Sequence, residues 1–316
     1  MRFAFVADAL ESLKIYKDST YAMMREAAAR GHGIHALQQE DLAWGGDAVV
    51  GHVRRLRLVD GPGGWYHADP PQKTSLSAFD AVLMRKDPPF DMEYIYSTYL
   101  LELAQDQGAR VFNDPRAIRD CNEKMAIAQF PRFIPPTLVT RRIELIHDFL
   151  SEHSDIILKP LDGMGGASVF RVHRADHNLN VIIETVTHYG RRTVMAQRFI
   201  PEIANGDKRI ILIDGKPVPF VLARIPRTGE TRGNLAAGAA GVARELSARD
   251  REIAEAVGPQ LAARGLLVVG LDVIGDWLTE INVTSPTCFQ EIAEQTGFNV
   301  AGMMLDALEK RCAIPI

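Results

Sequence analysis

Cysteine is scarce in this sequence. Its 316 residues include three cysteines, Cys121, Cys288 and Cys312, which are far apart and odd in number. A disulfide framework needs pairs of cysteines and a zinc site needs closely spaced ligands, so neither is expected. The three cysteines fit free thiols in a reducing compartment, and we therefore expect a cytoplasmic protein.

The sequence also lacks long hydrophobic runs and a strong charge of one sign. No apolar run approaches the length of a membrane span, and the N-terminal run lacks a cleavage site of the signal-peptide type. The formal net charge is -4, so nothing suggests a nucleic-acid partner. Hydrophobic residues make up 47% and charged residues 24%, which predicts a globular protein, and the length allows two or three packed units.

The first third of the chain alternates strand-like and helix-like segments. Short apolar stretches at 3–7, 33–37, 80–84 and 110–112 are typical of strands, and Asp91 is a good N-cap for a helix to about Gln107. This alternation predicts a parallel sheet with flanking helices. A loop with three prolines at 130–136 indicates a domain boundary nearby.

A hairpin near the C-terminus carries three oxygen-bearing side chains among apolar neighbours. Two strands joined at Gly275-Asp276 would hold Asp272, Glu280 and Asn282, a ligand set that suits Mg²⁺. Glu280 and Asn282 share a face because side chains alternate along a strand. A plain two-residue turn would pair Asp272 with Thr279, on the other face. We predict instead a longer loop or a bulge that pairs Asp272 with Glu280; the alternative is a solvated hairpin face.

The loop after the strand at 80–84 contains adjacent cations. Arg85 and Lys86 are followed by two prolines, at the carboxyl end of a strand, where ligands bind in open α/β sheets. The planar fork of Arg85 matches a carboxylate, so this loop is a candidate site for an anionic substrate. The alternative is a surface turn with a solvated Arg-Lys pair.

Two lysines and a glycine-rich turn indicate a second kind of site. Lys159 ends an otherwise apolar strand and should meet an anion, because a buried ammonium without a partner is costly. The turn Leu161–Ser168 that follows could bring backbone N–H groups close to phosphate oxygens, although hairpins often carry glycines. Lys124 is placed on a helix predicted over 115–129, where a lone lysine is usually a solvated surface residue.

Arginines lie on the next predicted strands. Arg209 and Arg224 have apolar neighbours around a turn at Asp214-Gly215, so each needs an anionic partner. The segment 225–241 has four glycines and no evident periodicity, which predicts a long functional loop. Arg232 at its centre would suit a lid that brings a cation to a phosphoryl group; the alternative is a mobile surface loop.

Together these stretches resemble the prokaryotic glutathione synthetase family, within the ATP-grasp superfamily. The resemblance covers nearly the whole chain in family order, and it departs at Ala239 and Ala240, where more glycine is expected. It rests on Leu83–Asp91, Arg119–Lys124, Ile157–Gly166, Gly206–Arg209, Ala223–Pro226, Gly229–Gly238, Leu271–Gly275 and Thr279–Thr287.

The resemblance implies a fold and a reaction. The expected fold is α/β and α+β: a Rossmann-like, parallel-sheet N-terminal domain over 1–122, then a two-lobed ATP-grasp domain over 123–316, with lobes of about 123–200 and 201–316. The implied reaction joins γ-glutamylcysteine and glycine, with ATP as co-substrate and Mg²⁺ or alternatively Mn²⁺ as cofactor, to give glutathione, ADP and phosphate. A homotetramer without membrane or nucleic-acid partners is also implied.

The same resemblance implies a role for each candidate residue. ATP would be held by Lys124, Lys159, Gly163, Met164, Gly165, Gly166, Gln197, Phe199, Ile200 and Asn234. The metal would be held by Asp272, Glu280 and Asn282, the peptide substrate by Arg85 and Ser285, and the reacting groups by Arg209, Arg224 and Arg232.

Two other functions compete with this one. A related ATP-grasp ligase with another acid and amine should lack the Met84–Pro89 stretch, and a non-catalytic nucleotide-binding module should lose Glu280, Asn282 or the arginine of the lid. The chain retains all of these. A dehydrogenase is excluded because the glycine-rich turn does not follow the first strand. An ATP-dependent ligase also fits the absence of any evident Ser-His-Asp or Cys-His set.

Overall fold

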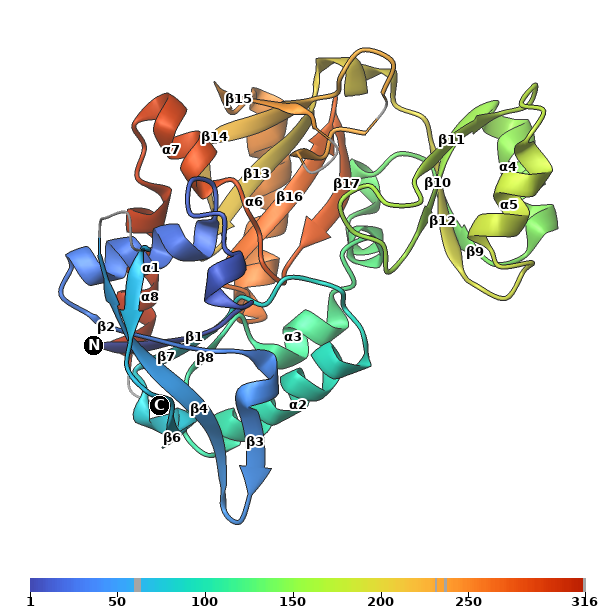
Figure 1. Cartoon of the computed structure of the whole chain (residues 1–316). Coiled ribbons are helices and arrows are strands. Elements are labelled where there is room, and N and C mark those ends of the chain that lie inside the picture. The colour runs from blue at the N-terminus through green and yellow to red at the C-terminus, as the bar shows by residue number, and fades with distance from the viewer. Residues whose placement is uncertain (60–63, 231, 236–237, 315–316) are drawn as a thin grey trace.

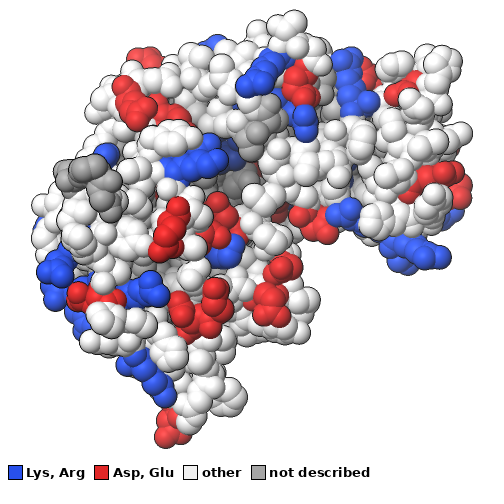
Figure 2. All heavy atoms as spheres, in the orientation of Figure 1, with Lys and Arg blue, Asp and Glu red and all other residues white. Residues whose placement is uncertain are grey.

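The chain forms three β-sheets in this computed structural model, which describes residues 1–59, 64–230, 232–235 and 238–314 (Figure 1). The sheets follow one another along the sequence. Figure 1 shows the second sheet, with helices α4 and α5, standing apart from the body formed by the other two sheets. Figure 2 shows basic and acidic side chains interspersed over the same face of the molecule.

The first sheet has the strand order β3-β4-β2-β1-β7-β8, with β5 and β6 paired to β4. Its parallel centre is β2-β1-β7-β8, as the sequence predicts, but β4 pairs antiparallel with β2, β3, β5 and β6. The sheet is therefore mixed rather than wholly parallel. Its strands are β1 Arg2–Val6, β2 Gly33–Leu37, β3 Leu42–Gly45, β4 Ala48–Leu58, β5 Tyr66–Ala68, β6 Gln72–Ser75, β7 Ala81–Met84 and β8 Val111–Phe112.

Helices α1 (Ser19–Ala29) and α2 (Met92–Asp106) flank this sheet, and each begins at an aspartate. The carboxylates of Asp18 and Asp91 accept hydrogen bonds from the backbone N–H groups of Tyr21 and Tyr94, which satisfies one free donor at each helix start. The predicted cap at Asp91 is confirmed.

One predicted helix is wrong in its extent. The segment 115–129 forms the short helix α3 (Pro115–Asp120) and a 3₁₀-helix (Met125–Gln129), with a non-helical turn between them. The side-chain oxygen of Asn122 accepts from the backbone N–H groups of Lys124 and Met125, and the carbonyl of Glu123 accepts from the N–H of Ile281. The turn is thus tied to the C-terminal hairpin, and Lys124 is 2% exposed rather than solvated.

The second sheet forms a small lobe with its own core. Its antiparallel order is β11-β10-β12-β9, and α4 and α5 pack on it through apolar side chains such as Ile146, Leu150 and Ile183. The elements are β9 Thr137–Thr140, α4 Ile143–His153, β10 Asp155–Pro160, β11 Phe170–His173, α5 Leu179–Val186 and β12 Val194–Arg198. The glycine-rich turn joins two antiparallel strands, β10 and β11.

The third sheet is antiparallel, with the order β15-β14-β13-β16-β17. Helix α6 begins at Ser247, whose hydroxyl accepts a hydrogen bond from the backbone N–H of Asp250, and helices α7 and α8 end the chain's regular structure. The elements are β13 Asp207–Ile213, β14 Lys216–Ile225, β15 Ala240–Glu245, α6 Ala248–Ala263, β16 Val268–Ile274, β17 Trp277–Asn282, α7 Phe289–Thr296 and α8 Val300–Cys312.

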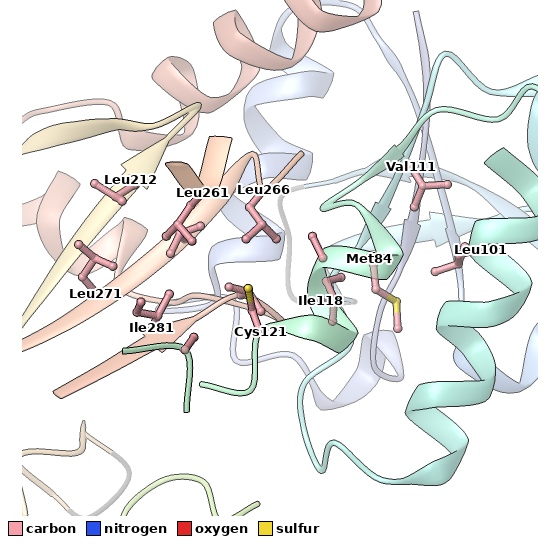
Figure 3. Packing of buried hydrophobic residues seen from close by; sticks show 14 of the residues in the cluster. Met84, Leu101, Val111, Ile118, Cys121, Leu212, Leu261, Leu266, Leu271 and Ile281 are labelled. Carbon is pink, nitrogen blue, oxygen red and sulfur yellow. The ribbon is translucent and has the colours of Figure 1, made fainter. Parts of the chain in front are cut away.

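Apolar packing joins the third sheet to the N-terminal sheet. One cluster of buried side chains runs from Met84, Leu101 and Val111 through Ile118 to Leu271 and Ile281 (Figure 3). Helix α8 also contacts α1, where Arg30 pairs with Glu26, Asp306 and Glu309. The two sheets therefore share a core, which fixes the positions of the loops between them.

Candidate active site

A cavity of about 670 Å³ lies where the three sheets meet. Its volume is in the range of small-molecule sites. The lining comes from β10, the glycine-rich turn, β12, β13, β14, the β16–β17 hairpin and the loops after β1 and β7. All the candidate residues of the sequence analysis line it except Arg85.

The predicted register of the C-terminal hairpin is confirmed. Asp272 pairs with Glu280, and the next pair, Val273 with Leu278, leaves Thr279 as an extra residue in a bulge. The hydroxyl of Thr279 donates to the Asp272 carbonyl at 3.0 Å. The bulge places Asp272 and Glu280 side by side, with Asn282 two residues further along β17.

Asp272 sits between two buried arginines. Its carboxylate accepts hydrogen bonds from Arg209 at 2.6 and 3.1 Å, and it lies 3.0 Å from a terminal nitrogen of Arg224. Burial alone would raise the pKa of Asp272, but Arg209 and Arg224 outweigh it and hold that pKa below its ordinary value. Each arginine on a buried strand thus has the anionic partner that the sequence requires.

Asp207 completes this charged group at the start of β13. One oxygen lies 2.5 Å from Arg224, while the other is buried without a hydrogen-bond partner among the described residues. Burial is the main cause that raises the pKa of Asp207 to about 6, against the opposing effect of Arg224. The cavity therefore holds a carboxylate that the sequence analysis did not single out.

Lys124 and Lys159 converge on Glu280 from different segments. Lys159 lies 3.5 Å from the Glu280 carboxylate and Lys124 lies 3.8 Å from it. Burial lowers the pKa of Lys159. For Lys124 burial acts the same way, but Glu280 and Glu123 outweigh it and raise the pKa. Two ammonium groups beside one another at the cavity wall form a ready site for a polyanion.

The glycine-rich turn contacts the long loop after β14. A Cβ added at Gly166, whose φ is +80°, would lie 2.6 Å from the side-chain oxygen of Asn234 and 3.1 Å from Arg232. The carbonyl of Gly163 accepts from Lys124 at 2.6 Å. Of the loop predicted over 225–241, β14 extends to Ile225 and β15 starts at Ala240, while residues 231, 236 and 237 lie outside the described residues.

The stretch 197–200 lies where β12 leaves the small lobe. Gln197 is buried and donates to the hydroxyl of Thr137 at 3.0 Å. The guanidinium of Arg171 stacks 3.6 Å over the ring of Phe199 and also pairs with Asp155. This stacking fixes an aromatic ring at the cavity wall.

The two candidates for the peptide substrate are placed differently. Ser285 lines the cavity and donates a hydrogen bond to Asp87. Arg85 is 5% exposed, and its guanidinium donates to the hydroxyl of Thr20 at 3.1 Å and the carbonyl of Pro286 at 2.9 Å. Arg85 thus holds the loop that carries Ser285, and the structure does not bring its guanidinium to the cavity.

Several lining residues were missed by the sequence analysis, among them Lys17, Glu123, Asp207, Cys288 and Glu291. Two of them adjoin residues that were singled out, Glu123 before Lys124 and Asp207 two residues before Arg209. A charged residue in a buried turn or strand is the signal that would have found those two. For Lys17 and Glu291 no local pattern is evident.

The donor set fits a magnesium ion that shares its ligands with phosphate. No group of three or more His, Cys, Asp or Glu side chains able to hold a metal occurs in the described part of the chain. Asp272, Glu280 and Asn282 offer two carboxylates and an amide oxygen, and the amide nitrogen of Asn282 already donates to the Gly270 carbonyl at 3.3 Å. Because Mg²⁺ takes one or two carboxylates plus substrate phosphates, these residues suit it when a nucleotide is bound.

The three-sheet arrangement is that of the ATP-grasp proteins. The whole chain is similar in fold to D-cycloserine synthetase DcsG, with a TM-score of 0.71, 17% identity and coverage of 99% of this chain and 100% of that one. It is also similar to the ATP-grasp ligase PsnB complexed with a precursor peptide and AMPPNP, with a TM-score of 0.64, 18% identity and coverage of 99% and 98%.

Sequence comparison narrows this class to one family. Residues 1–119 match the model of the prokaryotic glutathione synthetase N-terminal domain, and residues 123–297 match that of the prokaryotic glutathione synthetase ATP-grasp domain. The chain belongs to the prokaryotic glutathione synthetase family.

Curated relatives match over almost their entire length. The chain is 66% identical to a glutathione synthetase of Nitrosomonas europaea, over 99% of each chain. It is 61% identical to one of Ralstonia nicotianae, over 98% of this chain and 96% of that one. It is 54% identical to one of Vibrio parahaemolyticus, over 98% of each.

Proposed function

We propose that the cavity is the active site of a glutathione synthetase, which joins γ-glutamylcysteine and glycine with ATP to give glutathione, ADP and phosphate. One observation carries this function: relatives of 53–66% identity over nearly the whole chain bear that name. The residues of the cavity agree with an ATP-dependent ligase and supply the roles described below.

The nucleotide would lie between the small lobe and the third sheet. Lys124 and Lys159 would contact its phosphates, and the turn Gly163–Gly166 would cover them with backbone N–H groups. The purine would lie against the stretch Gln197–Ile200, where the Phe199 ring is already fixed by Arg171. These assignments rest on the buried positions of the two lysines and on the shared cavity wall.

Asp272, Glu280 and Asn282 would hold Mg²⁺, which neutralises phosphate charge during transfer. In the structure Glu280 faces two lysines and Asp272 faces two arginines. Binding of a nucleotide would give these four cations phosphate oxygens as partners. The carboxylates would then be available to the metal.

The reaction would proceed through an acyl phosphate. A carboxylate oxygen of the cysteinyl residue attacks the terminal phosphorus of ATP, and the bond to the bridging oxygen of ADP breaks. The amine of glycine, having lost a proton, then attacks the acyl carbon, and phosphate leaves with the bonding pair. Arg209 and Arg224 would hold the carboxylate and the developing phosphate charge close to Asp272.

The long loop after β14 would act as a lid. Arg232 and Asn234 already contact the glycine-rich turn, so closing one loop over the phosphates brings the other with it. A closed lid excludes water, which would otherwise hydrolyse the acyl phosphate. Arg232 would add a positive charge at the transferred group.

At the peptide end, Ser285 would contact γ-glutamylcysteine. Arg85 would act through the Pro286 carbonyl, which keeps the 284–288 loop against the cavity. We therefore assign to Arg85 a positioning role in place of the direct substrate contact that the family resemblance implies for it.

The assembly and the cellular location are proposals as well. Helix α2 exposes an apolar stripe, with Met92, Tyr96 and Tyr99 each at least half exposed, and Trp44 on β3 is 62% exposed. A stripe of this kind on the N-terminal domain supports the homotetramer that the family resemblance implies. The three cysteines are buried thiols, in keeping with a reducing cytoplasm. Among the described residues no helix has the length and apolar character needed to span a bilayer.

Release of ADP tests the function. Purified protein with Mg²⁺ and ATP is given γ-glutamylcysteine and glycine singly and together, and both ADP and glutathione are measured. We expect ADP release with glutathione formation when both substrates are present. ADP release that requires a different acid or amine would be consistent with the fold but would refute the proposed substrates.

A further inference from the structure

Glu291 on helix α7 has a buried carboxylate oxygen that nothing in the fold uses. The residue lines the cavity, and its Oε2 has no hydrogen-bond partner among the described residues. Burial raises the pKa of this carboxyl, which indicates an incompletely compensated charge. A buried carboxylate oxygen without a donor is costly in a folded protein, so its retention at a cavity wall points to a ligand.

A cation lies near this carboxylate in the same cavity. Lys17 also lines the cavity, and its charge lowers the pKa of Glu291, against the effect of burial. Lys17 takes part in no ion pair within the described residues; its ammonium lies 5.9 Å from the centre of the Tyr16 ring. Lys17 and Glu291 therefore offer one free charge of each sign.

The fold fixes the two segments to each other. The side-chain amide of Gln290, next to Glu291, donates to the carbonyl of Ile15 at 2.6 Å and to that of Asp18 at 2.7 Å. The backbone N–H of Phe289 donates to the hydroxyl of Ser19 at 3.2 Å. Since these bonds flank both charged residues, the first turn of α7 and the segment before α1 form one preorganised wall.

We propose that Lys17 and Glu291 form a subsite for the free α-amino-acid end of a substrate. Glu291 receives the α-ammonium group and Lys17 the α-carboxylate. The proposal rests on the proposed function, since both of its amino-acid substrates carry such an end. Free glycine has an ammonium and a carboxylate on one carbon, and the γ-glutamyl residue has the same pair because its peptide bond uses the side chain.

The charges around Glu291 favour a zwitterionic ligand over a phosphate. The charged groups acting on Glu291 are Lys17, Glu294 and, more weakly, Arg209. A phosphate here would meet the Glu291 carboxylate. A zwitterion instead places a donor on Glu291 and an acceptor on Lys17, and it satisfies the orphaned oxygen.

Steady-state kinetics of E291Q and K17Q test the subsite, with E255Q on the exposed side of α6 as the control. Each test variant replaces a charge and keeps nearly the same length. We expect KM for one amino-acid substrate to rise about tenfold or more, as for the loss of one charge-assisted hydrogen bond. KM for ATP should stay within about twofold of wild type, and E255Q should match wild type throughout.

Hydroxylamine identifies which substrate uses the subsite. It is largely uncharged at neutral pH and can replace glycine as the nucleophile, giving a hydroxamate of γ-glutamylcysteine. If the subsite serves glycine, E291Q raises KM for glycine but leaves hydroxamate formation unchanged. If it serves the γ-glutamyl residue, KM for the peptide rises in both reactions.

Either of these results supports the proposal. Unchanged KM values for both amino-acid substrates in E291Q and K17Q would overturn it, and so would a loss confined to kcat or to KM for ATP. The proposed function is judged separately by the wild-type protein. If the wild-type protein makes no glutathione, the proposed function fails. If wild type makes glutathione and the KM values of E291Q and K17Q are unchanged, the subsite alone is refuted.

Discussion

The change Glu280→Gln separates the two roles that the structure gives to this carboxylate. In the structure Glu280 is the shared counter-ion of Lys159 at 3.5 Å and Lys124 at 3.8 Å. With a nucleotide bound it is a proposed metal ligand. The glutamine keeps the shape of the side chain and removes its charge, so both roles are lost without a large change in packing.

The magnitude follows from the burial of the two lysines. Removing one partner of a buried ion pair costs about 3–5 kcal/mol. The cost of an unpaired ammonium is limited by its deprotonation, which at pH 7 amounts to roughly 5 kcal/mol for an ordinary lysine. Because Lys124 keeps Glu123 at 2.5 Å, and Glu280 is itself partly exposed, we expect a loss of about 2–4 kcal/mol. For a chain of 316 residues this lowers the unfolding midpoint by roughly 3–6 °C.

Thermal unfolding and turnover are measured on the same preparations, with Glu255→Gln on the exposed side of α6 as a control. Turnover with Mg²⁺ should fall at least about 100-fold, since a metal supplies several kcal/mol of charge stabilisation. Near-normal turnover would refute the assignment of Glu280 to the metal. An unchanged midpoint with turnover lost would instead refute the account of Glu280 as counter-ion of two buried lysines.

Three further predictions concern the loops and the buried carboxylates. Proteolytic cleavage within 225–241 should leave ATP binding intact and greatly reduce ligation, and unchanged ligation after cleavage would rule out a catalytic lid. Gly166→Ala should lower kcat about tenfold or more, because a Cβ there lies 2.6 Å from Asn234 and the φ of +80° disfavours alanine. The control Gly297→Ala, also at a positive φ but with nothing within 4 Å of the added Cβ, should leave kcat unchanged. Asp207 holds its proton to a pKa of about 6 when folded and to about 3.8 when unfolded, so its contribution to stability falls as pH rises from about 4 to about 6. The unfolding midpoint of wild type minus that of Asp207→Asn should therefore decrease over that window and level off above it; a constant difference would contradict the burial of that charge.

The sequence was most informative where the alternation of side chains along a strand and the chemistry of the residues lead to the same prediction. The side chains of Asp272, Glu280 and Asn282 can lie on one face only if the hairpin contains an extra residue. The bulge at Thr279 provides that residue. The buried lysine at the end of β10 and the arginines of β13 and β14 were likewise expected to have anionic partners. In each case the cost of burying a charge made the prediction specific.

Long-range contacts explain what the sequence did not reveal. Lys124 has the local pattern of a surface helix residue, but Asn122 and the Ile281 N–H turn its segment inward. Arg85 has the pattern of an anion-binding loop, yet Thr20 and the Pro286 carbonyl take its guanidinium. Glu291 became noticeable only when its helix was placed beside residues 15–18, 272 or more positions away in the chain.

The most direct measurement of the central claim follows one oxygen atom. γ-Glutamylcysteine labelled with ¹⁸O in its cysteinyl carboxylate is incubated with the protein, Mg²⁺, ATP and glycine, and the products are analysed by mass. Transfer through an acyl phosphate predicts one ADP for each glutathione and one ¹⁸O in each phosphate released. Unlabelled phosphate, or ADP release without glutathione, would contradict the account.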